Sequence, residues 1–123
     1  NFINWAVKCD SYLVAGQSPS FDRDFVKYTA ERYHINWPLS HRTIDLHSIC
    51  YFHMIDRGVM TFLKNGKSDI NSDTIMRYVG IPNEPKPHIA INGAKYEAEA
   101  FYRFFYKKPL FDEFKKYKIP WVA

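Results

Sequence analysis

Only two short segments of this 123-residue chain have the composition of β-strands, and this scarcity limits the folds available to it. The first is SYLVAG, residues 11–16, an apolar run closed by a glycine. The second is RTIDLHS, residues 42–48, in which apolar and polar residues alternate. An amphipathic helix is predicted between them over residues 20–35, with Ser20 as its N-cap. Because two strands are too few for a stable sheet in water, we expect residues upstream of Asn1, or another chain, to complete the sheet.

The rest of the chain has mainly helical periodicity. A helix starting near Ala90 should place Ala94, Ala98, Phe101 and Phe105 on one apolar stripe. Further helices are expected over residues 2–10, 48–64 with a bend at Gly58, and 73–80 with Ser72 as the cap and Gly80 as the stop. The chain is therefore expected to be one α/β domain, residues 1–123, with a helix-rich C-terminal portion.

Composition excludes several classes of protein. At 46% hydrophobic and 18% aromatic residues the chain is not disordered. It contains neither an apolar run of about 18 residues that would span a membrane nor a secretory signal sequence. Cys9 and Cys50 are too few for a disulfide framework, so we predict two buried, reduced thiols and a cytoplasmic protein without membrane partners.

The positive charge of the chain is concentrated at its C-terminal end. Residues 1–100 hold eleven basic and eleven acidic side chains, whereas residues 101–123 hold six basic and two acidic ones among nine aromatics. This composition is compatible with phosphate contacts and base stacking. It is equally typical of a terminal amphipathic helix whose aromatics pack on the core while its lysines face solvent, and we favour that interpretation.

Two segments place a polar side chain near the start of a predicted helix, where α/β sheets commonly build their sites. AGQSPSFDRDF, residues 15–25, contains Asp22, and PHIAINGAKYEAEAF, residues 87–101, contains His88. Asp22 is explained either as a first-turn acid that complements the helix dipole or as a metal ligand. His88 is equally consistent with an ordinary loop histidine.

Four motifs in order extend over most of the chain: GQSPSFD (16–22), RTIDLHS with Asp45, DTIMRYVGIP (73–82) and HIAINGAKYEAEAF (88–101). In this order they resemble the DnaQ-like (DEDDh) 3′–5′ exonucleases of the ribonuclease H-like superfamily. The corresponding motifs of that family have the approximate forms G-H-N-x-x-F-D, a strand with Ile/Val-Asp-Leu, L-x-x-x-L-G-I-P, and H-x-A-L-x-D-A-x-x-x-A-x-x-F. The resemblance implies a ribonuclease H-like fold whose first strands are missing from this chain.

The resemblance also implies a mechanism. In that family, four carboxylates hold two divalent metal ions, Mg²⁺ or Mn²⁺, for phosphodiester hydrolysis, and a histidine acts as general base. Carried over by position, Asp22 is a metal ligand, His88 is the base, and Gln17, Ser18 and Phe21 contact the substrate. The expected partner is the 3′ end of a single-stranded nucleic acid, and a homodimer is the assembly that the family suggests.

The sequence departs from the family pattern at three points. No strand with Asp-x-Glu precedes residue 16, the last carboxylate falls at Gly93, and Gln17-Ser18 replaces His-Asn. Glu97, one helical turn after Gly93, could reach back to the vacant ligand position, or it could be a solvated helix charge. We therefore expect 3′–5′ exonuclease activity of the intact protein and none of this chain alone. The alternative is a catalytically degenerate nuclease-like domain that binds nucleic acid or a protein partner.

Overall fold

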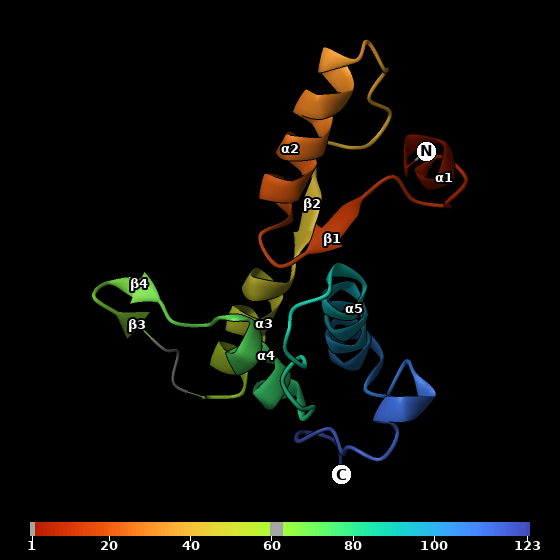
Figure 1. The fold of residues 1–123 in the computed structure, drawn as a ribbon. Coiled ribbons are helices and arrows are strands. Elements are labelled where there is room, and N and C mark those ends of the chain that lie inside the picture. Colours follow the sequence, from red (N-terminus) through yellow and green to blue (C-terminus); the bar gives the residue numbers. More distant parts are fainter. Residues whose placement is uncertain (1, 60–62) are drawn as a thin grey trace. The chain divides into compact units, whose positions relative to one another are not determined.

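The chain is of mixed α/β composition, with two small sheets among its helices (Figure 1). The computed structural model describes residues 2–59 and 63–123. The chain divides into two compact units, residues 1–45 and residues 46–123. They are called the N-terminal and C-terminal units below, and each is described by itself.

The N-terminal unit is built around a parallel pair of strands. Its elements in chain order are α1 (Phe2–Ala6), β1 (Val14–Gly16), α2 (Pro19–Arg32) and β2 (Thr43–Asp45). The strands lie in the predicted segments but are shorter, with Val14 opposite Thr43 and Gly16 opposite Asp45. Parallel strands need a long crossover connection, and α2 provides it while contacting both strands (Figure 1). The register therefore brings the carboxyl ends of β1 and β2 together.

Helix α2 begins earlier than the sequence predicts. Ser18, and not Ser20, is the N-cap, and Pro19 is the first helical residue. Ser18 has a left-handed backbone conformation with φ of 53°, and its side chain makes no capping hydrogen bond. The fixed φ of proline suits the first position of a helix, which explains why the helix starts at Pro19.

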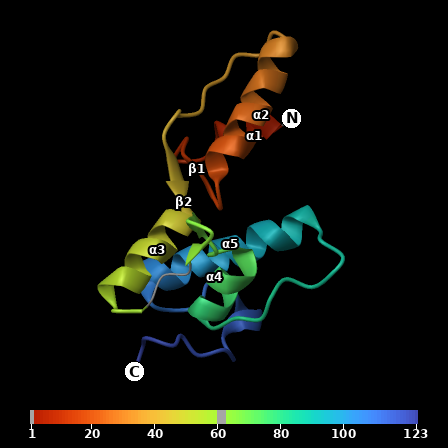
Figure 2. The same cartoon turned by 90° about the vertical axis from the view of Figure 1, so that its left-hand side faces the viewer.

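The C-terminal unit packs its helices around one apolar core (Figure 2). Its elements are α3 (Leu46–Asp56), β3 (Leu63–Lys64), β4 (Lys67–Ser68), α4 (Ser72–Val79), α5 (Ala90–Tyr106) and a 3-10 turn (Asp112–Phe114). Helix α5 contacts both α3 and α4. The core consists of the following buried side chains: Leu46, Cys50, Met54, Ile70, Ile75, Met76, Val79, Ile81, Ala100, Phe104 and Phe114.

The predicted helix over residues 48–64 is shorter in the structure. It begins at Leu46 and ends at Asp56, and Gly58 has φ of 69°, which stops the helix instead of bending it. Residues 60–62 of that prediction lie outside the described residues. Leu63–Lys64, the end of the predicted helix, instead forms a small antiparallel hairpin with Lys67–Ser68.

The C-terminal helices confirm part of the prediction. Helix α4 stops at Gly80 as predicted, but its N-cap is Asn71, whose side chain accepts a hydrogen bond from the Thr74 amide. Helix α5 has the predicted extent, but its apolar stripe is wrong because Ala94 and Phe105 are exposed. The buried face instead consists of Glu99, Ala100, Arg103 and Phe104.

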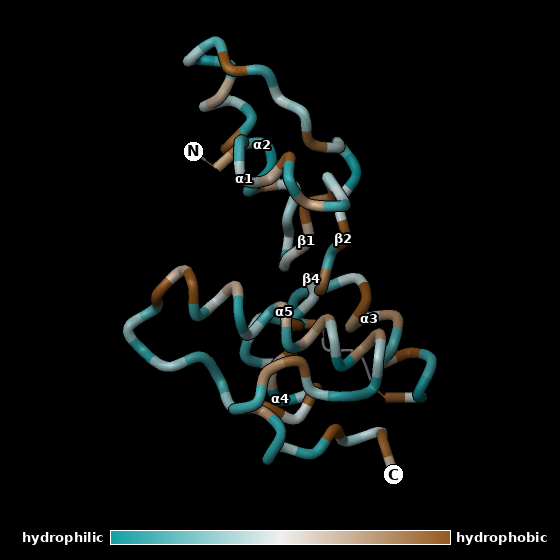
Figure 3. Tube along the Cα trace, turned by 90° about the vertical axis from the view of Figure 1, so that its right-hand side faces the viewer, coloured by the Kyte–Doolittle hydropathy of each residue, from teal (hydrophilic) through white to brown (hydrophobic). Residues whose placement is uncertain are grey.

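The basic C-terminal segment packs on the core through its apolar side chains. Phe114 and Ile119 are buried, and Tyr117 and Trp121 are half-buried against the core. Its lysines at 107, 108, 115, 116 and 118 are exposed. Apolar and polar residues alternate along this segment in Figure 3. The favoured packing interpretation is thus supported, although a 3-10 turn replaces the expected helix.

Two expectations drawn from composition can be compared with the described residues. Among these residues, no helix is both long and apolar enough to cross a membrane. Both cysteines are free thiols, but only Cys50 is buried, whereas Cys9 is exposed. Burial raises the pKa of Cys50 to about 12, so this thiol stays protonated at neutral pH.

Candidate functional site

The carboxyl edge of the parallel strand pair carries the first group of candidate residues. Gly16 ends β1 opposite Asp45, which ends β2. The Asp45 side-chain oxygen Oδ1 accepts a hydrogen bond of 3.2 Å from the Ser18 amide. A carboxylate from β2 therefore fixes the backbone that leads into α2, and it satisfies an amide at the positive end of that helix.

The residues that the motif singles out lie within this same segment. Asp22 is exposed in the first turn of α2, where its charge complements the helix dipole. Phe21 is 73% exposed, Gln17 is half-buried and Ser18 is exposed. Both interpretations of Asp22 are compatible with this position, because a first-turn acid that faces solvent is also accessible to a cation.

His88 lies in the C-terminal unit, in the proline-rich loop before α5. Its ring nitrogen Nδ1 is 2.9 Å from Oε1 and 3.0 Å from Oε2 of Glu84. The Glu84 side chain is only 13% exposed, whereas that of His88 is 64% exposed. A carboxylate at Nδ1 favours the proton on that nitrogen, so Nε2 would be the acceptor of a neutral His88. Glu84 was not anticipated from the sequence, although its spacing of four residues from His88 was a usable signal.

Gly93 lies against this pair. A Cβ atom at position 93 would be 3.0 Å from Cε1 of His88 and 3.5 Å from Oε2 of Glu84. Such contacts are closer than ordinary van der Waals packing for the ring and comparable to it for the carboxylate. The absence of a side chain at this position therefore makes room for the Glu84–His88 pair at the start of α5.

The described residues do not form the two-metal centre that the resemblance implies. Among them, no group of three or more His, Cys, Asp and Glu side chains could hold a metal ion. Asp22 and Asp45 belong to the N-terminal unit, and Glu84 and His88 belong to the C-terminal unit. Glu97 is half-buried on α5, and the structure assigns it no place in a metal-binding group. The donor set of these residues therefore does not fit two divalent ions.

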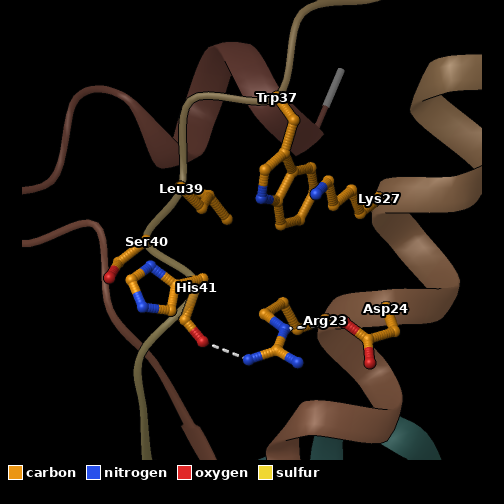
Figure 4. Close-up of a pocket in the computed structure, with 7 residues that line it drawn as sticks. All are labelled: Arg23, Asp24, Lys27, Trp37, Leu39, Ser40 and His41. Carbon is orange, nitrogen blue, oxygen red and sulfur yellow. Dashed lines mark hydrogen bonds and ion pairs between the residues drawn. The ribbon is translucent and has the colours of Figure 1, made fainter.

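A pocket in the N-terminal unit was not anticipated from the sequence (Figure 4). It has a volume of about 370 Å³ and lies between α2 and the loop that precedes β2. Helix α2 contributes Arg23, Asp24 and Lys27, and the loop contributes Trp37, Leu39, Ser40 and His41. The spacing of Arg23 and Lys27, four residues apart on one helix face, was the only signal in the sequence.

The charged groups of this pocket are held by specific contacts. Arg23 donates from Nε to Oδ1 of Asp24 at 2.8 Å, and it donates from Nη1 to the His41 carbonyl oxygen (Figure 4). The hydrogen bond with Asp24 raises the pKa of Arg23 and lowers that of the Asp24 carboxyl. Arg23 thus ties the loop to α2 and keeps its positive charge at the pocket.

The chain is of mixed α/β composition, and its candidate residues occur in three groups. They are Asp22 and Asp45 at the edge of the strand pair, Glu84 and His88 before α5, and the residues that line the pocket beside α2. Comparison with known proteins adds no relative, since no family model matches the sequence and no curated protein or solved structure is significantly similar to it.

Proposed function

We propose that the chain is a 3′–5′ exonuclease-like domain of the ribonuclease H-like type that binds the 3′ end of a single-stranded nucleic acid. The observation that carries this proposal is the parallel β1–β2 edge, where Asp45 fixes the Ser18 amide and Asp22 follows in the first turn of α2. Sites in α/β proteins form at the carboxyl ends of parallel strands. The ordered motifs GQSPSFD and HIAINGAKYEAEAF point to the same class of protein.

Each residue has a defined part in this proposal. Asp22 offers an exposed carboxylate of the kind that would bind Mg²⁺ or Mn²⁺ together with ligands from outside the described residues. His88, oriented by Glu84, accepts a proton at Nε2. Because the described residues lack a complete set of metal ligands, the 123-residue chain alone is expected to bind nucleic acid without hydrolysing it.

The test incubates the full-length gene product with a 5′-labelled single strand, with and without Mn²⁺. The expected result is metal-dependent shortening from the 3′ end, which Asp22→Asn and His88→Gln abolish. Ser20→Ala, on the same turn of α2, serves as the control and should retain activity. Retained binding without any metal-dependent shortening would contradict the exonuclease proposal. The chain of residues 1–123 is tested in parallel, and shortening by this chain that is lost in Asp22→Asn would contradict its expected inactivity.

A second candidate function is a nuclease-like domain that binds nucleic acid without cleaving it. The observation that favours it is Gly93, where the family pattern has a carboxylate and this chain has room for His88 instead. The two functions differ in one measurement. Metal-dependent shortening of the strand by the unsubstituted protein would favour the exonuclease, and binding without shortening would favour the binding function. Gly93→Asp supplies the carboxylate of the family pattern, so a gain of cleavage over an inactive unsubstituted protein would support the second candidate.

A further inference from the structure

The pocket between α2 and the loop of residues 37–41 combines three kinds of chemistry. Trp37 supplies an aromatic ring, Leu39 supplies apolar surface beside it, and Arg23 and Lys27 supply two positive charges (Figure 4). Asp24 compensates one of these charges, so Arg23, Lys27 and Asp24 together leave an excess of one positive charge at the pocket. This combination suits a ligand that carries both a flat ring and a phosphate.

We propose that this pocket binds one nucleotide of a single-stranded nucleic acid, with the base stacked on Trp37 and the phosphate held by Lys27. This inference deepens the proposed function and rests on it, because it names a binding position for the same strand. Base–aromatic stacking tolerates every base and requires bases that are not paired, so the pocket would select single strands without reading their sequence.

The two cations have different roles. The Arg23 side chain is only 18% exposed and is already bonded to Asp24 and to the His41 carbonyl oxygen, so it holds the pocket in shape. Lys27 is 46% exposed, and its ammonium nitrogen is 3.9 Å from Oε1 of Glu31. Such a long, solvated ion pair contributes little, and Lys27 is therefore able to turn toward a phosphate.

The position of the pocket along α2 supports the same ligand. Arg23 directly follows Asp22 in the chain, and Lys27 is five residues beyond Asp22, about 7.5 Å along the helix axis. A strand that occupies the pocket therefore passes close to the first turn of α2. The pocket volume of about 370 Å³ is of the size that holds one small ligand.

The test measures, by fluorescence anisotropy, binding of a fluorescein-labelled oligo-dT of twelve nucleotides to the chain of residues 1–123. The matching oligo-U is measured in the same way. Trp37→Ala should weaken binding about tenfold, and Trp37→Phe should retain most of the affinity because a ring remains. Lys27→Ala should weaken binding a few-fold and reduce the slope of log K against log salt by about one. A duplex of the same length should compete at least about ten times more weakly.

Matched controls come from the same unit. Trp5→Ala removes an indole that is 63% exposed and lies outside the pocket, and Lys8→Ala removes one exposed lysine charge. Both should bind as the unsubstituted chain does. Far-UV circular dichroism of each variant verifies that α2 is intact, and Lys27→Ala keeps the test valid where Trp37→Ala disturbs the fold.

The outcomes separate this inference from the proposed function. Trp37→Ala and Lys27→Ala variants that bind like their controls, an equal affinity for duplex, or Trp37-dependent binding of an acidic peptide in preference to the oligonucleotide would each overturn the inference. Trp37-dependent binding by a protein that never shortens the strand would leave the inference standing and contradict the exonuclease proposal. Asp22-dependent shortening that is insensitive to Trp37→Ala and Trp37→Phe would support the exonuclease proposal and overturn the inference about the pocket.

Discussion

Glu99 and Arg103 form an ion pair of 2.7 Å in which neither side chain is exposed to solvent. Arg103 also donates to the carbonyl oxygens of Val79, Phe114 and Tyr117. The second oxygen of Glu99 accepts hydrogen bonds from the amides of Leu110 and Phe111. Burying two charges is costly unless their hydrogen bonds are satisfied, and here the pair meets that condition while connecting α5 to the end of α4 and to the C-terminal segment.

Glu99→Gln should destabilise the C-terminal unit by about 3–5 kcal/mol, because it leaves the Arg103 charge buried without a counter-charge. The measurement is the free energy of opening from hydrogen exchange of α5 amides. The matched control is Glu113→Gln, which removes the partner of Lys95 in a pair of 2.8 Å whose side chains are 35% and 53% exposed. That change should cost less than about 1 kcal/mol. Equal effects of the two substitutions would show that burial of the pair does not matter.

His53 makes stability depend on pH. Burial lowers the pKa of His53, Arg57 and Lys107 lower it further, and Asp56 acts in the opposite direction. The ring packs against Trp121 and Phe104 and forms a 2.8 Å hydrogen bond with the Tyr78 hydroxyl.

The sign of this effect follows from linkage. The unfolded chain binds the His53 proton more readily than the folded one, so this contribution is present above the unfolded pKa of about 6.5 and is lost as the pH falls through the folded value. We expect urea midpoints to fall between pH 7 and pH 5, and His53→Gln to flatten this decrease. Parallel curves for the two proteins would contradict the assignment to His53.

At the scale of elements, the end of α4 depends on a glycine. Gly80 has φ of 84°, and a Cβ there would clash with the Lys118 carbonyl oxygen and lie 2.8 Å from Cδ of Pro120. Gly58, after α3, has φ of 69° but nothing within 4 Å of its would-be Cβ. The two positions therefore share a backbone conformation that disfavours L-residues and differ in available space.

Gly80→Ala should accordingly destabilise the protein more than Gly58→Ala does. The backbone conformation alone costs about 1–2 kcal/mol at either position, and the backbone contact at Gly80 should add at least about 1 kcal/mol. Urea unfolding followed by circular dichroism compares the two variants. A similar loss in both would mean that the C-terminal segment moves away from Gly80 at little cost.

Features of the elements that depend on local sequence signals could be predicted, whereas features that depend on tertiary contacts could not. Gly80 and the proline before α5 act locally, so the stop of α4 and the extent of α5 could be predicted. The buried face of α5 could not, because Glu99 and Arg103 have the spacing of an ordinary solvated pair and only tertiary contacts show that they are buried. The Asn65–Gly66 turn is the converse case, because Asn-Gly is a local hairpin signal in the sequence, yet the helix predicted over residues 48–64 overlaps the first strand of this hairpin.

The candidate sites also divide into residues that sequence motifs identify and contacts that only the fold produces. Asp22 and His88 could be identified from sequence motifs, and the structure confirms that each lies near the start of a helix. The partners of these residues could not be identified in this way. The contact of Asp45 with Ser18 depends on strand register, and the pocket around Trp37 depends on how a loop folds over α2.

At the scale of the whole molecule, apolar burial is unevenly distributed. Among the described residues, the core cluster lies entirely in the C-terminal unit, whereas the buried hydrophobic residues of the N-terminal unit are Ala6 and Ala30. Helix α2 exposes Phe21, Phe25 and Tyr28, each by more than 60%. Because burial of apolar surface is the main favourable contribution to folding, the two units should differ in stability.

Hydrogen exchange should therefore separate the two units. We expect α5 amides to be protected at least about 100-fold more than α2 amides, and residues 46–123 expressed alone to keep a cooperative thermal transition. Residues 1–45 expressed alone should lack one, because a two-stranded sheet with one long helix buries too little apolar surface to offset its conformational entropy.

Binding of a single strand at the Trp37 pocket would stabilise the N-terminal unit by mass action, so saturating oligo-dT should raise protection in α2 and leave α5 unchanged. Equal protection of α2 and α5 without oligonucleotide would show that the N-terminal unit is stabilised by contacts other than its own apolar burial.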